Sequence, residues 1–137
     1  MQPVMQLNLP ARLDSLAEFH QFVRAGARDC GIAPENIEKL DVVLEEILVN
    51  VARYAYAPEA GQVEVRYWQT GPCALRVEVS DAGVPFDPLQ CDPPDLTRGL
   101  AGRPIGGLGV FLIREFVDSI EYRRESGRNI LSFQFSG

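Results

Sequence analysis

Two kinds of hydrophobic spacing divide the 137-residue chain into strands and helices. Positions that alternate between apolar and polar predict strands, whereas apolar positions three or four residues apart predict amphipathic helices. The alternating pattern occupies residues 5–9, 63–68, 75–79, 119–124 and 129–135. The helical pattern occupies residues 16 to about 30, 35 to about 56, and 108–117.

Residues that favour turns separate these segments. Asp14-Ser15 offers an N-cap for the first helix, Gly31 stops it, and Pro34 suits the first position of the second helix. Thr70-Gly71-Pro72 and Ser126-Gly127 predict hairpin turns. Because the strands cluster in runs, we predict an α+β fold, a two-layer α/β sandwich. Its sheet is mixed and mostly antiparallel, with the helices on one face.

Length and composition limit the classes of function. At 137 residues, 46% of them hydrophobic, the chain suits one globular domain over 1–137. No apolar run approaches the roughly 18 residues of a membrane span, and no signal segment opens the chain. We therefore expect a cytoplasmic protein without a membrane partner. The net charge of −6 argues against direct nucleic-acid binding, which needs clustered Lys and Arg.

The three cysteines, Cys30, Cys73 and Cys91, do not predict a covalent or metal framework. They are an odd number, lie far apart without a Cys-x-x-Cys pair, and accompany a single histidine, His20. Neither a disulfide framework nor a zinc site is therefore expected. His20 is expected to be an ordinary surface or core residue of the first helix.

The second predicted helix carries candidate chemistry on one side. At about 100° per residue, Asn50 lies roughly 40° from Glu46, and Arg53 lies roughly 20° on its other side, at the flank of the apolar stripe. Asn is unfavourable inside a helix because its amide competes with backbone hydrogen bonds, and its oxygen is a good Mg²⁺ ligand. The pattern indicates either a metal-dependent site at a cleft edge or a solvated helix face with an incidental Asn.

Asp81 follows a predicted strand and precedes Ala82-Gly83. A carboxylate at this place either belongs to a plain turn or accepts a hydrogen bond from an exocyclic amine, such as that of adenine. Gly83 would then let the backbone pass close to the ring. Phe86 would add an apolar wall to the site, or join the core.

A glycine-rich loop precedes the last predicted helix. The loop consists of Gly106, Gly107, Leu108 and Gly109. Free N–H groups and the helix dipole at the start of a helix favour phosphate binding. The same glycines are also compatible with a flexible hinge that binds nothing. Residues 87–106 have little periodicity and many prolines, which is typical of a functional lid or a disordered segment. Arg103 of this segment is a candidate for contact with a γ-phosphate.

In this order, the elements resemble the GHKL ATPases, whose Bergerat fold is shared by gyrase B, MutL and histidine kinases. Glu46-Ile47-Leu48-Val49-Asn50 matches the N-box, Asp81-Ala82-Gly83 the first glycine box and Gly107-Leu108-Gly109 the second. The similarity covers nearly the whole chain. Through Tyr54-Ala55-Tyr56 and residues 107–118, the chain most resembles the bacterial anti-sigma-factor serine kinases of the RsbW/SpoIIAB type.

This resemblance implies an activity, cofactors and site residues. It implies a kinase that uses ATP and Mg²⁺, with Glu46 as general base, Asn50 as Mg²⁺ ligand and Asp81 as the residue that reads adenine. One departure is that the threonine often found near the closing strand is replaced around Arg128-Asn129.

The resemblance also implies partners. Members of the family form homodimers, sequester a sigma factor, and phosphorylate a serine on a STAS-domain antagonist. The regulated protein is therefore expected to be a sigma factor or another partner of that kind. The alternative is a non-catalytic ATP-binding adaptor or anti-sigma binding module, because a fold does not settle an activity.

Overall fold

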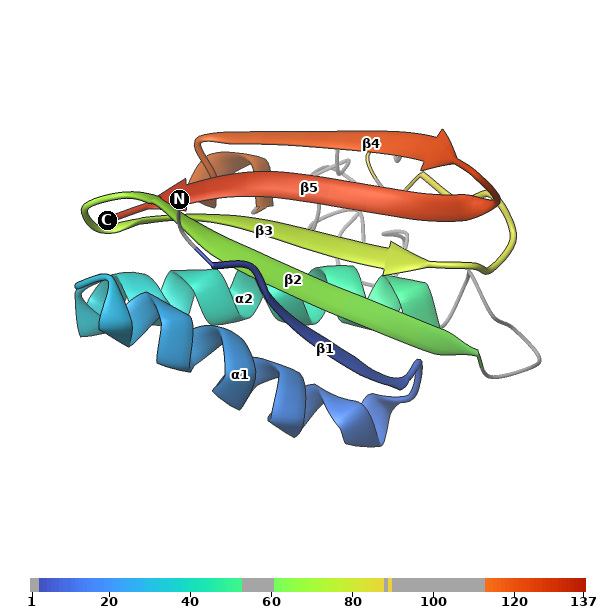
Figure 1. Ribbon diagram of the computed structural model, residues 1–137, viewed down its shortest axis with the longest axis horizontal. Helices are drawn as coiled ribbons and strands as arrows, with labels where there is room; N and C mark the ends of the chain where they lie inside the picture. Colours follow the sequence, from blue (N-terminus) through green and yellow to red (C-terminus); the bar gives the residue numbers. More distant parts are fainter. Residues whose placement is uncertain (1–2, 53–60, 88, 90–112) are drawn as a thin grey trace, which may run out of the picture.

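The computed structural model describes residues 3–52, 61–87, 89 and 113–137, and Figure 1 shows their arrangement. The elements in chain order are β1 (Met5–Pro10), a 3₁₀ turn (Leu13–Ser15), α1 (Leu16–Asp29), α2 (Pro34–Asn50), β2 (Gln62–Gly71), β3 (Ala74–Asp81), β4 (Ser119–Glu125) and β5 (Arg128–Ser136). Residues 113–116 are also helical. The end of the second predicted helix, beyond residue 52, and the start of the third lie outside the described residues.

The described elements form two layers. The five strands make one sheet in the order β1-β2-β3-β5-β4, and all four pairings between them are antiparallel. Helices α1 and α2 lie along one face of this sheet (Figure 1). The chain leaves the sheet after β3, returns at the edge as β4, and then places β5 between β3 and β4. The predicted α+β sandwich with helices on one face is confirmed, but the described strand pairs are all antiparallel, where a mixed sheet was expected.

The core lies between the two layers and follows the predicted periodicities. Along β3, the buried residues Leu75, Val77 and Val79 alternate with partly exposed ones. The apolar stripe of α2 is buried throughout, at Leu40, Val43, Leu44, Ile47, Leu48 and Val51. This packing fixes the rotation of α2 about its axis, and with it the side on which Glu46 and Asn50 lie. No helix among the described residues is long and apolar enough to cross a membrane.

Helix α1 begins and ends where the sequence predicts, at Leu16 and Asp29, but its N-cap does not work as expected. Gly31 has a left-handed backbone with φ of 93°, its N–H donates to Arg28 O at 3.1 Å, and Ile32 N–H donates to Ala27 O at 3.0 Å. These two bonds form a Schellman motif, which explains why glycine stops the helix. Ser15 is the N-cap residue, as predicted, but the 3₁₀ turn holds it in a helical conformation and its side chain makes no capping hydrogen bond.

The two hairpin turns fit the sequence to different degrees. Ser126 and Gly127 have φ of 53° and 76°, the backbone of a type I′ turn, as predicted. The β2–β3 turn lies further along the chain than predicted, with Pro72 and Cys73 between the paired residues Gly71 and Ala74. Cys73 therefore holds the left-handed position, with φ of 55°, that a glycine usually occupies after a proline in a turn.

Gly26 in α1 leaves room for the ring of Tyr67 on β2. A Cβ added at Gly26 would overlap three atoms of that ring, which is buried and packs on Phe22. We expect Gly26→Ala to lower the free energy of unfolding by about 1–3 kcal/mol, because overpacking outweighs the gain in helix propensity. Urea unfolding of both proteins measures the difference.

The control for this prediction removes the ring. In a Tyr67→Ala background, Gly26→Ala should no longer lower the free energy of unfolding. Without the ring there is no steric overlap, and the higher helix propensity of alanine is the effect that is left. Equal stability of Gly26→Ala and the unmodified protein would show that the Tyr67 ring does not press on α1 in solution.

Candidate nucleotide site

The strongest candidate site lies where the end of β3 meets the C-terminal half of α2. Asp81 is the last residue of β3 and is 2% exposed. It lines a small pocket together with Ile47, Val51, Val79, Phe86, Tyr122, Asn129 and Leu131. The space among these residues is about 10 Å³, room for about one water, so an adenine ring requires the walls to separate.

One carboxylate oxygen of Asp81 is engaged by the protein itself. Asp81 Oδ1 accepts hydrogen bonds from the Gly83 amide and from Asn129 Nδ2, each at 2.9 Å. None of the described residues donates to Asp81 Oδ2, although a buried carboxylate oxygen ordinarily has a donor. A structural role in the turn therefore explains the hydrogen bonds of Oδ1 but leaves Oδ2 without a donor among the described residues. An amine of a ligand could donate to Oδ2.

Asn129, at the start of β5, connects the site to the sheet. It is 4% exposed, and its Nδ2 donates to Val84 O at 2.8 Å as well as to Asp81. Its Oδ1 accepts from the Phe86 amide at 3.1 Å and from the Tyr122 hydroxyl at 2.5 Å. A buried amide with this many partners holds the loop from Asp81 to Phe86 in one position.

Sequence reasoning missed Asn129 as a site residue. A signal was present, because Leu131, Phe133 and Phe135 alternate as buried positions along β5 and Asn129 continues their phase. A polar side chain at a buried position needs hydrogen-bond partners. The β3–β5 register supplies one of them, since it places Asn129 directly opposite Asp81.

Arg124 of β4 is a second residue that sequence reasoning did not connect to the site. Its Nη1 donates to Gly83 O at 2.8 Å and to Asn129 Oδ1 at 3.1 Å. Gly83 itself is buried. The backbone at Gly83 is thus held both by the Asp81 carboxylate and by this guanidinium.

Helix α2 carries Glu46 and Asn50 on one side, as its periodicity predicts. Asn50 Nδ2 donates to Glu46 Oε1 at 3.3 Å. Asn50 is 5% exposed and Glu46 is half-buried, so a solvated helix face does not explain the Asn. The residue that follows each of them, Ile47 and Val51, lines the Asp81 pocket, whereas Glu46 and Asn50 themselves are not among its lining residues.

These residues fit a nucleotide bound together with Mg²⁺. Asp81 provides a buried acceptor for a purine amine, and Asn50 provides an amide oxygen for a hard cation. The described part of the chain contains no group of three or more His, Cys, Asp or Glu that could hold a metal by itself. Mg²⁺ is usually bound by one or two carboxylates together with substrate phosphates, so the Asn50 amide oxygen would be one ligand among several.

The remaining predicted site residues lie outside the described residues: Arg53, Arg103, Gly106, Gly107, Leu108 and Gly109. Of the predicted lid, 87–106, residues 87 and 89 alone are described. There, Asp87 Oδ1 accepts a hydrogen bond from the Leu89 amide at 2.9 Å. The phosphate-binding loop and the lid stay predictions.

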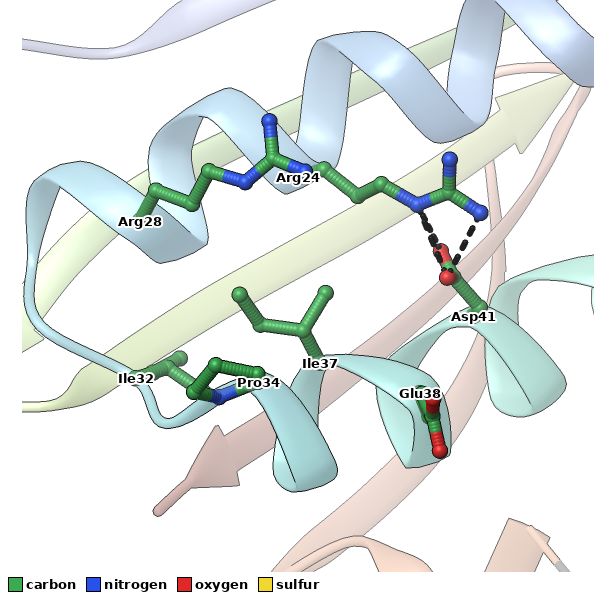
Figure 2. Close-up of a pocket in the computed structure, with 7 residues that line it drawn as sticks. All are labelled: Arg24, Arg28, Ile32, Pro34, Ile37, Glu38 and Asp41. Atoms are coloured by element: carbon green, nitrogen blue, oxygen red, sulfur yellow. Dashed lines mark hydrogen bonds and ion pairs between the residues drawn. The ribbon is translucent and has the colours of Figure 1, made fainter.

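A larger hollow, of about 450 Å³, lies between α1 and α2 and is separate from these residues (Figure 2). It is lined by Arg24, Arg28, Ile32, Pro34, Ile37, Glu38 and Asp41. Arg24 Nη2 lies 2.7 Å from Asp41 Oδ2, and this hydrogen-bonded pairing raises the pKa of Arg24. His20 Nδ1 lies 3.1 Å from Asp41 Oδ1. The single histidine therefore belongs to the packing of the two helices, as expected.

Comparison with known proteins places the chain in a family. The sequence profile of the histidine kinase-like ATPase domain matches residues 9–135. The chain therefore belongs to the histidine kinase-like ATPase domain family, as the GHKL resemblance implies. Its curated relatives include the serine-protein kinases RsbW of Bacillus cereus and Bacillus thuringiensis. Each is 24% identical over 135 residues, which cover 96% of this chain and 84% of the relative.

Solved structures share the fold. The RsbU and RsbW domains of a Mycobacterium tuberculosis protein superpose with a TM-score of 0.66 at 15% identity. The match covers 98% of this chain and 32% of that one, so the chain spans about a third of its length. The SiaB–SiaC complex of Pseudomonas aeruginosa gives a TM-score of 0.61 at 16% identity, with 96% and 88% covered.

Proposed function

We propose that this chain is an ATP-dependent serine/threonine protein kinase and anti-sigma factor of a partner-switching system. Its substrate is a serine on a STAS-domain antagonist. The observation that carries the proposal is the pairing of Glu46 with the buried Asn50, each of which directly precedes a residue, Ile47 or Val51, that lines the Asp81 pocket. A carboxylate and a hard-metal ligand beside a purine pocket are a sufficient minimal set for phosphoryl transfer.

The nucleotide is held by residues from both layers. Asp81 accepts a hydrogen bond from the adenine amine, Phe86 contacts the ring, and Asn50 ligates Mg²⁺. The loop residues Gly106, Gly107, Leu108 and Gly109 approach the phosphates with their N–H groups, and Arg53 and Arg103 contribute positive charge. When bound, ATP would supply the phosphoryl group and Mg²⁺ would neutralise part of the negative charge of the phosphates.

Glu46 acts on the incoming serine. Its carboxylate orients the serine hydroxyl or accepts its proton, as a general base does. The hydrogen bond from Asn50 Nδ2 keeps this carboxylate next to the Asn50 side chain. Because phosphoryl transfer passes through a loose transition state, positioning of the reactants contributes more to the rate than covalent catalysis by the protein.

The regulated partner is a sigma factor, or another protein that this chain sequesters as a cytoplasmic homodimer. Support comes from the relatives, which are named serine-protein kinase RsbW, and from the structural likeness to SiaB, which was solved in complex with SiaC. The net charge of −6 speaks for protein partners over nucleic acid.

Transfer of a labelled phosphoryl group tests the proposal directly. A pull-down from the native cytoplasm, with ATP and with ADP, provides the candidate partners. The purified chain is then mixed with Mg²⁺, ATP labelled at the γ-phosphate and each STAS-domain protein among them. We expect label on one serine of one STAS protein and none after that serine is changed to alanine.

The alternative function is a non-catalytic ATP-binding adaptor or anti-sigma binding module. The observation on its side is the identity of 24% to the named kinases, at which the fold and the nucleotide site can persist without the activity. A STAS protein that is captured in the presence of ATP but never labelled would support the adaptor and overturn the kinase.

A further inference from the structure

Cys30 and Cys73 are distant in the sequence but adjacent where the end of α1 meets the β2–β3 turn. The Cys73 amide donates a hydrogen bond to the Cys30 carbonyl oxygen at 3.0 Å. This direct backbone hydrogen bond places the two residues side by side, as a disulfide requires, since its Cα atoms lie about 4.4–6.8 Å apart.

The two thiols also lie among shared neighbours. Cys73 Sγ donates to Gly31 O at 3.3 Å, and Gly31 directly follows Cys30. The Cys30 thiol lies beside the backbone N–H of Ala74, which directly follows Cys73, and donates to Ala27 O at 3.5 Å. Each sulfur is therefore next to the backbone of the residue that follows the other cysteine, and both are free thiols.

We propose that Cys30 and Cys73 form a thiol–disulfide modification site, oxidised by a low-molecular-weight disulfide of the glutathione type and reduced again by thiols. The site is independent of the proposed kinase function. The turn that presents Cys73 supports this assignment, because Cys73 has a φ of 55° at a place where glycine is the usual residue. Its carbonyl oxygen is held by the Gly137 amide at 2.9 Å, which keeps the turn in place.

Exposure sets the order of the two steps. Cys73 is partly exposed, whereas Cys30 is 9% exposed. Burial raises the pKa of the Cys30 thiol, against the opposing effect of the Ile32 and Ala74 amides, so Cys30 stays protonated near neutral pH. Cys73 is therefore the first thiol to react, and Cys30 is the resolving thiol.

The reaction exchanges disulfides without a net change in sulfur count. The Cys73 thiolate attacks one sulfur of the small disulfide, forms a mixed disulfide and releases one small thiol. Cys30 then gives its proton to water, and the thiolate that forms attacks Cys73 Sγ, closes the Cys30–Cys73 bond and releases the second small thiolate, which takes up a proton. The protein loses two thiol protons and two electrons, and the small disulfide gains them as two thiols.

The pair lies away from the candidate nucleotide site. Strand β3 begins at Ala74, next to Cys73, and ends at Asp81. At about 3.3 Å per residue, this strand separates the pair from the Asp81 pocket by roughly 23 Å. Figure 1 shows β3 running from the turn that follows β2 to the opposite end of the sheet. The disulfide would join the end of α1 to the β2–β3 turn, and it would not involve the residues that line the Asp81 pocket.

Peptide mapping of the unmodified, folded protein tests the proposal. Trypsin places Cys30, Cys73 and Cys91 on separate peptides, residues 29–39, 67–76 and 77–98. After incubation with oxidised glutathione and alkylation of the remaining thiols, we expect peptide 29–39 linked to peptide 67–76. The intact protein should be about 2 Da lighter than its reduced form, and dithiothreitol should reverse the change.

Three matched controls sharpen the result. Cys91→Ser should keep the link, Cys73→Ser should lose it, and the chain unfolded in urea should lose the preference for this pair. Separate glutathione adducts on the two peptides of the folded protein would overturn the proposal. A link to peptide 77–98 in place of 67–76, or thiols that stay unreacted, would overturn it as well.

Discussion

Glu46→Gln should cut phosphoryl transfer to the STAS-domain partner by about 10²–10⁴-fold, the usual contribution of a positioned base, and leave the ATP affinity within a few-fold. Glutamine retains an Oε1 acceptor for Asn50 Nδ2, which donates to Glu46 Oε1 at 3.3 Å. The local packing should therefore survive, while the capacity to accept a proton is lost. Initial rates of transfer and equilibrium binding of ATP, measured on the same preparations, separate the two effects.

Two further variants of α2 serve as controls for Glu46. Glu45 projects roughly 100° away from Glu46, its side chain is 61% exposed, and its contact with His20 Nε2 is 3.9 Å, so Glu45→Gln should be nearly silent. Asn50→Ala should weaken Mg²⁺-dependent binding and transfer together, because it removes a metal ligand. If Glu46→Gln transfers phosphoryl groups as fast as the unmodified protein, Glu46 is a structural neighbour of Asn50 and the adaptor is favoured.

Asp81→Asn should weaken ATP binding by about 1–3 kcal/mol, or roughly 5- to 150-fold, the cost of losing a buried charged hydrogen bond. An asparagine oxygen can still accept from the Gly83 amide and from Asn129 Nδ2, as Asp81 Oδ1 does. Its NH₂ group then replaces Oδ2 and meets the adenine amine as a second donor. The fold should therefore survive while the ligand contact is lost, and calorimetric titration with ATP measures the loss.

The same residue predicts a choice between purines. The unmodified protein should bind ATP in the micromolar range and prefer it to GTP, because a carboxylate attracts an amine and repels the keto oxygen at the same ring position. In Asp81→Asn the new donor suits that keto oxygen, so the preference for ATP should shrink. Equal affinity of the unmodified protein for ATP and GTP would remove Asp81 from the role of adenine reader.

Local spacing was sufficient to predict most of the fold. The alternation in β3 and the stripe on α2 report directly which side chains are buried, and the structure buries Leu75, Val77 and Val79 of β3 as that pattern requires. Gly31 could be predicted as the end of α1 because its φ of 93° is a property of one residue. The same spacing placed Glu46 and Asn50 on one side of a helix.

The predictions that went wrong depend on neighbours in space or on a competing local structure. Ser15 is a good capping residue by type, but the 3₁₀ turn before α1 supplies the helical geometry that makes a side-chain cap unnecessary. The β2–β3 turn centres on Pro72 and Cys73 because the strands pair in a register that leaves those two residues between Gly71 and Ala74. Register depends on the partner strand, which local sequence does not contain.

By itself, the sequence determined the helices, the strands, the family motifs and the carboxylate at Asp81, since each depends on residues close together in the chain. Only the tertiary structure decided which distant residues complete the site. The pairing of β5 with β3 brings Asn129 to Asp81, and the pairing of β4 with β5 adds Arg124. Likewise, cysteines without any spacing motif became neighbours when α1 packed against the β2–β3 turn. Such contacts arise from the burial of a common core, which acts between residues regardless of their separation in sequence.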